Sequence, residues 1–357
     1  MYIGVTVKSV LNMHDLNNER AEEIRRVPII YRDENGKWNV FEEAVAVSGI
    51  MVKHWHFAYM VTLGSKENVD FCDYCKRLEA IRVPSEKPEK KKTKEDKEVE
   101  LEENEAETST EKKARSELDI ISKCAGEDIH GFLRAKPSLR RESLVKFSWM
   151  LPTPSKESIE KFGLPTPFRV LQHSRNVREI PPAAPEEVRQ AQMPYPRSYA
   201  NGIYGFVSTL NLAHIGHSFT DDKDIEDKDK IVTRKRIAVQ AYIPMLTGAV
   251  GASLARALPV SDILDVIVIY SDKPIPAPVH PIYPDYINEN IKLYEGVSNA
   301  LECDITMYQW SKEKTNEKEQ ETSEKGQFRV IHTKTPADGF TEIIKKLEEQ
   351  THTVSKK

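Results

Sequence analysis

The stretch Val47-Ser-Gly-Ile-Met-Val-Lys-His-Trp-His-Phe57 directly follows a predicted β-hairpin. The hairpin has strands at 27–32 and 38–47, and its turn contains Asn35-Gly36, a dipeptide that favours a tight turn. Serine is a favoured helix N-cap, and the apolar residues after it can share one helical face, so we expect a helix from about 48 to 63. This part of the chain therefore predicts a helix that begins where a hairpin ends.

Strand and helix patterns alternate along the rest of the chain, which indicates an α+β fold. The predicted strands outside the hairpin are residues 2–12, 142–150, 202–219, 263–271 and 328–334. The predicted helices after the first are residues 68–82, a short helix after 118, one or two helices within 232–257, and 337–350. A βαββαβ sheet with insertions fits this order, but the pattern alone leaves other α/β arrangements open.

Much of the acidic charge lies in three stretches, residues 85–117, 221–230 and 311–327. By count these stretches carry a combined charge of about −7, against −4 for the whole chain, so the remainder is close to +3. The first and third stretches contain too few large apolar residues to offset the entropy of ordering, and we expect them to be disordered or solvated insertions. The mildly basic remainder permits a polyanionic partner.

Several classes of protein and site are not expected. No stretch approaches the roughly 18 consecutive apolar residues of a membrane-spanning helix, and the first strand lacks the apolar block of a signal peptide. Without such a segment, we expect no membrane partner. The four cysteines are too few for a disulfide scaffold, which fits a reducing compartment, so we expect a cytoplasmic protein. Cys72-Asp-Tyr-Cys75 is a lone Cys-x-x-Cys pair and Cys124 and Cys303 are distant from it, so we expect no metal site and no cofactor.

The start of the predicted helix at 48 is the first of four candidate anion-binding places. Ser48 and Gly49 precede Lys53 and His54 within two helical turns. The spare N–H groups and the positive end of the dipole at a helix N-terminus suit a phosphate. The alternative is ordinary capping by Ser48, with the basic side chains facing water.

The second place is the pair Arg140-Arg141, just before a predicted strand. Forked guanidinium donors grip phosphates well, and a solvated turn, with an ion pair to Glu142, is the alternative explanation. The third place has Gly248 and Gly251 ahead of Arg256, where a backbone without side chains could approach a nucleic acid. A helix kink or close helix packing is the alternative explanation for these glycines.

The fourth place is His173-Ser-Arg175-Asn176-Val-Arg178, at the mouth of a long segment rich in proline and arginine. Long loops often carry binding residues, although charge can also simply keep a loop soluble. The chain has no Gly-x-Ser-x-Gly or His-Glu-x-x-His motif. Potential general bases remain at His14, His54, His56, His130, His214 and His217. The four basic places without a catalytic set predict a protein that holds a phosphate backbone.

Six short motifs in a fixed order carry a resemblance to a known family. They are Leu11-Asn-Met-His-Asp-Leu-Asn17, Arg25-Arg-Val-Pro-Ile-Ile30, Val47-Ser-Gly49, Asp128-Ile-His-Gly-Phe-Leu133, Arg140-Arg-Glu-Ser-Leu-Val-Lys146 running into Trp149-Met-Leu-Pro152, and Gly248-Ala-Val-Gly251 before Arg256-Ala-Leu-Pro259. Together they resemble the DevR-type CRISPR-associated proteins of the RAMP superfamily, whose members form the backbone of the type I-A Cascade complex. The chain departs from this family at Ala252 and Leu254, which occupy positions that are often basic.

The resemblance implies a ferredoxin-like, RNA-recognition-type palm with a helical insertion and a β-hairpin thumb. Residues 1–67 would form the first part of the palm and 68–127 the helical and charged insertion. Residues 128–357 would form the rest of the palm, with the thumb near 164–200 and the charged insertion near 311–327. The order of the motifs therefore implies one discontinuous domain with excursions.

The resemblance also implies a function. Copies would stack head to tail along one CRISPR RNA as a helical filament, with target DNA reached through the guide and other Cascade subunits as further partners. The implied RNA-binding residues are Arg26, Ser48, Gly49, Lys53, His54, Arg140, Arg141, His173, Arg175, Asn176, Gly248, Gly251 and Arg256. This protein would not be an enzyme. The alternatives are a RAMP endoribonuclease that processes CRISPR transcripts and a DNA-binding autoregulator.

Overall fold

The secondary structure is mixed α+β, as the sequence predicts. The computed structural model describes residues 1–16, 18–20, 23–33, 35–79, 116–134, 138–153, 166–172, 195–246, 259–314 and 328–354. The helices are α1 (Gly49–Lys66), α2 (Asp73–Lys76), α4 (Glu117–Lys123), α5 (Ala125–His130), α8 (Lys228–Gln240), α9 (Tyr242–Leu246), α10 (Tyr286–Leu301), α11 (Asp338–Val354) and the 3-10 turn η1 (Lys312–Lys314). None of the described helices is both long and apolar enough to cross a bilayer.

The strands of the described residues form one large sheet and four two-stranded ribbons. The large sheet contains β1 (Tyr2–His14), β8 (Val145–Phe147), β9 (Leu151–Pro152), β10 (Phe168–Gln172), β11 (Tyr195–Asn211), β14 (Val260–Ser271), β15 (Ile305–Ser311) and β16 (Phe328–His332). The ribbons pair β2 (Asn18–Arg20) with β3 (Glu23–Ile24), β4 (Arg26–Arg32) with β5 (Trp38–Val45), β6 (Phe132–Arg134) with β7 (Leu139–Arg141), and β12 (His217–Ser218) with β13 (Lys223–Asp224).

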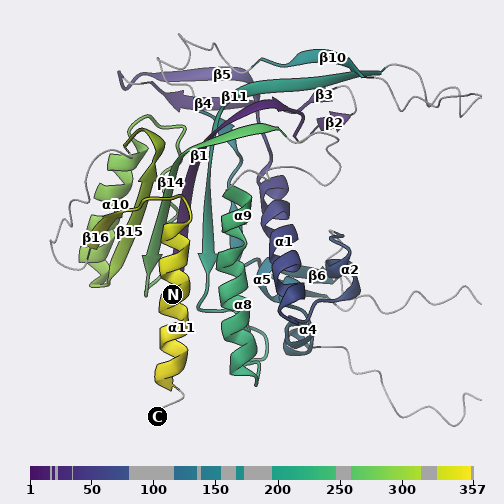
Figure 1. Cartoon of the computed structure of the whole chain (residues 1–357), viewed down its shortest axis with the longest axis vertical. Coiled ribbons are helices and arrows are strands. Elements are labelled where there is room, and N and C mark those ends of the chain that lie inside the picture. The colour runs from purple at the N-terminus through teal and green to yellow at the C-terminus, as the bar shows by residue number, and fades with distance from the viewer. Residues whose placement is uncertain are drawn as a thin grey trace, which may run out of the picture.

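The first strand, β1, lies at the centre of the large sheet. The strand order is β10-β11-β1-β14-β15-β16, and β8 and β9 pair with the free side of β11. Every neighbouring pair is antiparallel except β15 with β16. The longest described strand, β11, extends beyond its pairing with β1 to pair with β10, near the β4–β5 ribbon (Figure 1). The N-terminal strand is therefore held on both edges by strands that are distant in sequence.

Both faces of the central strands are covered. On one face, alternate β1 residues such as Val5 and Val7 are buried in a core shared with α1, α8, α9 and α11, which lie side by side in Figure 1. On the other face, α10 packs over β14 and β15 through Tyr294. Gly4 lies against the ring of Pro278 on this second face, where a Cβ would be 2.8 Å from the proline Cγ. The sheet is therefore an inner layer rather than an open surface.

The predicted hairpin is confirmed. Strands β4 and β5 pair around a turn in which Gly36 has a φ of 79°, a left-handed conformation that favours glycine. The Asp33 carboxylate accepts hydrogen bonds from the N–H groups of Asn35 and Lys37, both at 3.0 Å. A side-chain hydrogen bond from Asn39 is the main reason that the pKa of Asp33 is lowered. Local turn chemistry thus fixes this element.

One predicted helix is wrong, and two elements were missed. The helix predicted over 68–82 is reduced to α2, because Asn68 and Leu78 adopt positive φ angles of 58° and 59° that interrupt a right-handed helix. Helix α10 and strand β15 were not predicted at all. The charged stretch 85–117 lies outside the described residues except for its last two positions, and the stretch 311–327 except for its first four.

The buried histidine at the end of β1 makes the stability depend on pH. His14 Nε2 lies 2.9 Å from the Tyr204 hydroxyl, and burial lowers the pKa of His14 to about 4 from 6.5. The unfolded chain therefore binds this proton at a higher pH than the folded protein, so stability is lost as the pH falls from about 6.5 to about 4. The full loss is about 3 kcal/mol.

We expect His14→Gln to reduce the fall in melting temperature between pH 7 and pH 5, measured by circular dichroism. His332→Gln is the matched control, because its side chain is exposed in the folded protein. If His14→Gln and the wild type lose the same number of degrees over this interval, the buried histidine does not cause the acid sensitivity.

Candidate nucleic-acid interface

Helix α1 begins at a point where three segments that are distant in sequence meet. Val47 forms a β-bridge with Met150, with N–O distances of 3.0 and 2.8 Å. The N–H of Ala46 donates to the Arg25 carbonyl at 3.2 Å, and the Ser48 side chain caps the helix by accepting from the Met51 N–H at 3.3 Å. The N-terminus of α1 is therefore fixed between the hairpin and the strand segment near residue 150.

Ser48 and Gly49 have local structural roles. Both residues are buried, and a Cβ on Gly49 would lie 2.5 Å from the Phe147 carbonyl oxygen and 2.8 Å from that of Ser148. The glycine thus lets the helix pack against protein backbone, where we expected it to let a phosphate approach. The structure supports the capping alternative for Ser48, whose side chain satisfies one of the spare N–H groups of the helix.

We expect Gly49→Ala to lower the free energy of unfolding by about 1–3 kcal/mol, because the methyl group overlaps backbone atoms that cannot rotate away. Urea titration of the purified protein measures this change. Gly296→Ala in α10 is the control, since a Cβ there meets no atom within 4 Å and alanine favours the helix by about 1 kcal/mol. A Gly49→Ala variant as stable as the wild type would contradict the packing role.

Basic and aromatic side chains surround the start of α1. Arg26 is exposed and forms an ion pair with Glu43 at 2.7 Å. The Arg25 guanidinium lies over the Trp149 ring at 5.7 Å from its centroid, and Trp149 is partly exposed. Arg25 and Trp149 were not among the predicted site residues, although the Arg25-Arg26 doublet and the motif containing Trp149 were visible in the sequence.

The first two turns of α1 add two further basic side chains. Lys53 is half-buried and its Nζ donates to the His130 carbonyl at 3.1 Å. The His54 ring is half-buried, 6.1 Å from the Phe57 ring. We call the residues around the start of this helix the α1 entry surface; they are Arg25, Arg26, Ile50, Lys53, His54 and Trp149. Of the predicted RNA-binding residues, Lys53 and His54 thus lie in the first two turns of α1, and Arg26 lies on β4, next to Arg25, whose carbonyl accepts from the Ala46 N–H.

The arginine pair at 140–141 is divided between the surface and the interior. The Arg141 side chain is fully buried and donates to Glu117 Oε1 at 2.5 Å and to Asp128 Oδ1 at 2.7 Å. Its remaining donors reach backbone carbonyls of Asp128, His214 and His217. The prediction that Arg141 grips a phosphate is therefore wrong, because its donors are occupied inside the protein.

A second arginine completes this buried network. Arg234 donates to Asp128 Oδ2 at 3.0 Å and to the Ile121 carbonyl at 2.7 Å. Although burial acts in the opposite direction, hydrogen bonds from Arg141 and Thr220 lower the pKa of Glu117. The network joins α4, α5, β7 and α8, so its charges stabilise the arrangement of elements beside α1.

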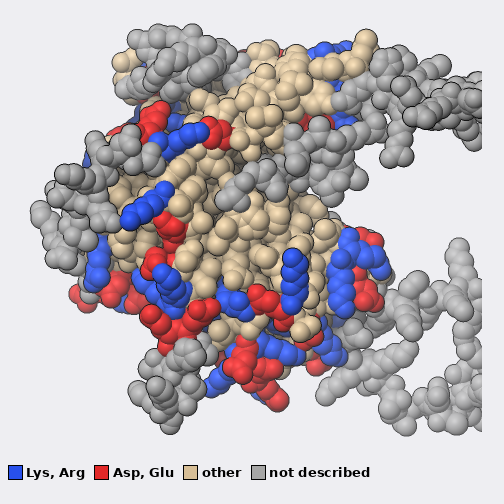
Figure 2. All heavy atoms as spheres, in the orientation of Figure 1, with Lys and Arg blue, Asp and Glu red and all other residues tan. Residues whose placement is uncertain are grey.

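Arg140 remains on the surface and lines a cleft of about 620 Å³. Lys146 lines the same cleft, with its Nζ 3.5 Å from Glu142. On the face drawn in Figure 2, the described Lys and Arg side chains are interspersed with Asp and Glu over the lower helices. The exposed cations therefore form local groups among acidic residues on that face.

The remaining predicted positions cannot be placed. The residues of the proline-rich loop and of the glycine-rich loop lie outside the described residues; they are His173, Arg175, Asn176, Gly248, Gly251 and Arg256. They stay predictions from the sequence.

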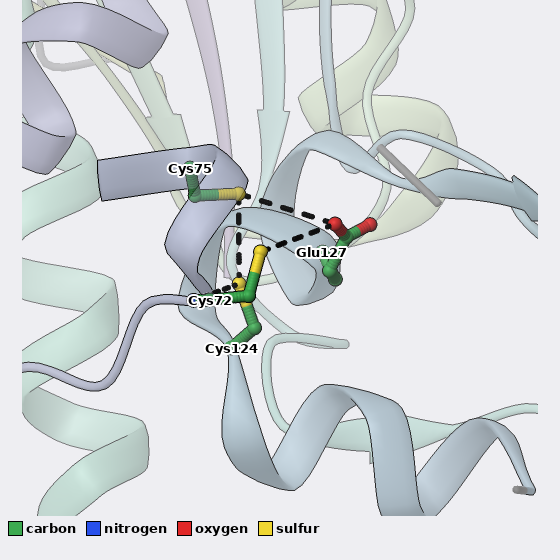
Figure 3. A group of neighbouring side chains, drawn as sticks. All are labelled: Cys72, Cys75, Cys124 and Glu127. Atoms are coloured by element: carbon green, nitrogen blue, oxygen red, sulfur yellow. Dashed lines mark hydrogen bonds between the residues drawn. The ribbon is translucent and has the colours of Figure 1, made fainter. Parts of the chain in front are cut away.

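The cysteine prediction is wrong in its geometry. Cys124, which is 49 residues from Cys75, packs against the Cys-x-x-Cys pair with its Sγ 3.6 Å from Cys75 Sγ. The Glu127 carboxylate lies 3.8 Å from Cys72 Sγ and 3.9 Å from Cys75 Sγ (Figure 3). The sequence pattern does not reveal this proximity, because the second pair, Cys124-Ala-Gly-Glu127, ends in glutamate rather than cysteine or histidine.

Comparison with known proteins agrees with the resemblance. A family profile described as the CRISPR-associated negative auto-regulator DevR/Csa2 matches residues 5–291. The chain is 33% identical to the CRISPR-associated protein Cas7/Cst2/DevR of Methanocaldococcus jannaschii, over 83% of this chain and 89% of that protein. It is 22% identical to the CRISPR-associated aCascade subunit Cas7/Csa2 2 of Saccharolobus solfataricus, over 81% and 85% of the two chains.

Among solved structures, a chain of a CRISPR RNA-guided surveillance complex in a pre-nicking state matches with a TM-score of 0.48 and 13% identity, covering 97% of this chain and all of that one. The profile match and the relative at 33% identity each span most of the sequence. This chain belongs to the CRISPR-associated DevR/Csa2 family.

Proposed function

We propose that this chain is a CRISPR RNA-binding backbone subunit of a type I-A surveillance complex. Copies stack head to tail along one guide, hold its sugar–phosphate backbone and leave the bases free to pair with target DNA. The observation that carries the proposal is the family match over residues 5–291, together with a relative that is named as an aCascade subunit. Other subunits of the complex are the further partners.

The α1 entry surface supports contact with a nucleic-acid backbone. It combines the basic side chains of Arg25, Arg26 and Lys53 with the partly exposed Trp149 ring. Arginine donors favour phosphates, and an aromatic ring can stack on a base or a sugar without selecting sequence. This combination suits a contact that repeats along any guide.

The topology supports a ferredoxin-like palm. The strand order β8-β11-β1-β14 is antiparallel throughout, with α1 between β1 and β8 and α8 between β11 and β14. That order matches a βαββαβ unit. The sheet face that RNA-recognition modules use for stacking is partly covered here by Pro278 and α10, which favours binding at the α1 entry surface instead.

The histidines give little support to the endoribonuclease alternative. His14, His56 and His130 are buried, and His56 Nδ1 lies 3.1 Å from His130 Nε2 inside the core. A general base must reach the proton that it removes, so these three side chains are poorly placed for RNA cleavage. The burial of these three histidines therefore favours the scaffold over the nuclease.

The experiment is purification of the full chain followed by analysis of the bound nucleic acid. We expect RNA of uniform length to copurify, and we expect repeat RNA incubated with the protein in EDTA to remain intact. Defined cleavage that is lost in His214→Ala would favour the nuclease instead. Binding restricted to one duplex DNA sequence would favour the autoregulator.

A further inference from the structure

Four potential metal ligands meet beside α1, on the neighbouring helices α2 and α5. Cys72 and Cys75 lie at the start of and within α2, and Cys124 and Glu127 lie at the start of and within α5. Figure 3 shows the four side chains directed toward one common point. Cys75, Cys124 and Glu127 are buried and Cys72 is half-buried, so the group lies inside the protein. Both pairs have the same two-residue spacing, which is the usual spacing of a structural zinc site.

Three of the six distances between the ligand atoms are close to the edges of a tetrahedron around one ion. One ligand atom from each of the four residues lies within 4.8 Å of all the others. The Sγ atoms of Cys75 and Cys124 are 3.6 Å apart. Glu127 Oε1 lies 3.8 Å from the Sγ of Cys72 and 3.9 Å from the Sγ of Cys75. A tetrahedral Zn²⁺ with bonds of about 2.3 Å to sulfur and about 2.0 Å to oxygen gives edges of roughly 3.8 Å and 3.5 Å.

We propose that Cys72, Cys75, Cys124 and Glu127 bind one structural Zn²⁺ ion. Three thiolates make the site soft, and four protein ligands, three of them buried, fill a tetrahedral ion and leave no open position for a substrate. A disulfide does not explain the group, because bonded sulfur atoms lie about 2.05 Å apart and all four described cysteines are free. The inference does not depend on the proposed RNA-binding function.

The surroundings of the ligands are adapted to the site. The N–H of Cys72 donates to Cys124 Sγ at 3.3 Å, the kind of backbone contact that orients a metal-bound thiolate. Gly126, between the second pair of ligands, has its Cα facing Cys75, and a Cβ there would lie 2.6 Å from Cys75 Sγ. A side chain at position 126 would push the two ligand pairs apart.

The site has a clear structural consequence. Its ligands lie on either side of residues 80–115, so one ion would join the two ends of that segment. Glu127 is also followed directly by Asp128, which accepts hydrogen bonds from Arg141 and Arg234. Binding of Zn²⁺ would therefore fix α5 and, through it, the buried charge network, because metal affinity at a structural site contributes to folding.

The test is metal analysis of the purified full chain, with cobalt as the spectroscopic probe. We expect about one Zn²⁺ per chain, and after exchange to Co²⁺ we expect thiolate charge-transfer and tetrahedral d–d absorption. Removal of the ion with a chelator should lower the melting temperature by roughly 5–10 °C. Cys124→Ser should lose most of the metal, whereas Cys303→Ser should keep it, because Cys303 lies in the separate core under α10.

A variant that strengthens the site keeps the test decisive if Cys124→Ser fails to fold. Glu127→Cys should retain the ion and increase the cobalt charge-transfer band by about one third, since three thiolates become four. The proposal is overturned if the chain contains no zinc after growth with added Zn²⁺, or if Cys75 and Cys124 form a disulfide in the purified protein. Equal metal loss in Cys124→Ser and Cys303→Ser also overturns it.

Discussion

Replacing Arg141 with alanine is expected to lower the free energy of unfolding by about 3–5 kcal/mol, because the change leaves Glu117 buried without its cation. Asp128 also loses one of its two arginine partners. Chemical denaturation of the purified variant measures the loss. Arg140→Ala removes the same group one residue earlier on the surface, and it should change stability by less than about 0.5 kcal/mol.

Comparing variants of Arg140 and Arg141 separates an effect on folding stability from an effect on RNA binding. Arg141→Lys keeps the charge but loses the forked donors that reach two carboxylates and three carbonyls, so its stability should fall between those of the wild type and Arg141→Ala. An Arg141→Ala protein that is fully stable but binds RNA more weakly would contradict the buried network and restore Arg141 as a surface contact.

The second large effect concerns RNA affinity. Replacing two cations with anions in the double variant Lys53→Glu with Arg140→Glu is expected to weaken RNA binding about 10- to 100-fold. The slope of log K against log salt should become shallower by the amount that corresponds to about two phosphate contacts. Lys53 lies on the α1 entry surface and Arg140 is exposed beside the neighbouring cleft. Fluorescence anisotropy with several unrelated RNAs of one length measures the change.

A control with the same change in charge is available elsewhere. Lys228 and Lys292 are exposed at the start of α8 and on α10. Lys228→Glu with Lys292→Glu should leave RNA affinity within about twofold of the wild type once salt screens long-range effects. If this control weakens binding as much as the first double variant, net charge rather than the predicted surface governs the interaction.

Elements with strong local signals were predicted correctly from the sequence. The turn at Gly36, the alternating first strand and the Ser48 cap each act through neighbouring residues. Helix α10 was missed because its buried stripe includes Asn290 and Ser298, which weaken the apolar pattern. The hydrogen bond that lets the polar Asn290 side chain be buried forms only in the folded chain, where its Oδ1 accepts from the Val279 N–H at 2.8 Å.

The site was predicted only in part, since burial is a property of the folded chain. Adjacent side chains of a strand point to opposite faces, so β7 directs Arg140 to solvent and Arg141 to the interior although both have the same side chain. The zinc ligands Cys124 and Glu127 share the spacing of Cys72 and Cys75, but only folding brings the two pairs together. Spacing alone could have indicated this site if a carboxylate had been allowed as the fourth ligand.

The central claim is that the protein holds an RNA backbone without reading its sequence. The most direct test is the dependence of binding on salt for guide-length RNAs of unrelated sequence, measured with the wild-type protein. The account predicts a linear fall of log K with log salt, about 0.7 per phosphate contact, and similar affinities for all the RNAs. Affinity that hardly changes with salt, or that belongs to one sequence alone, would contradict it.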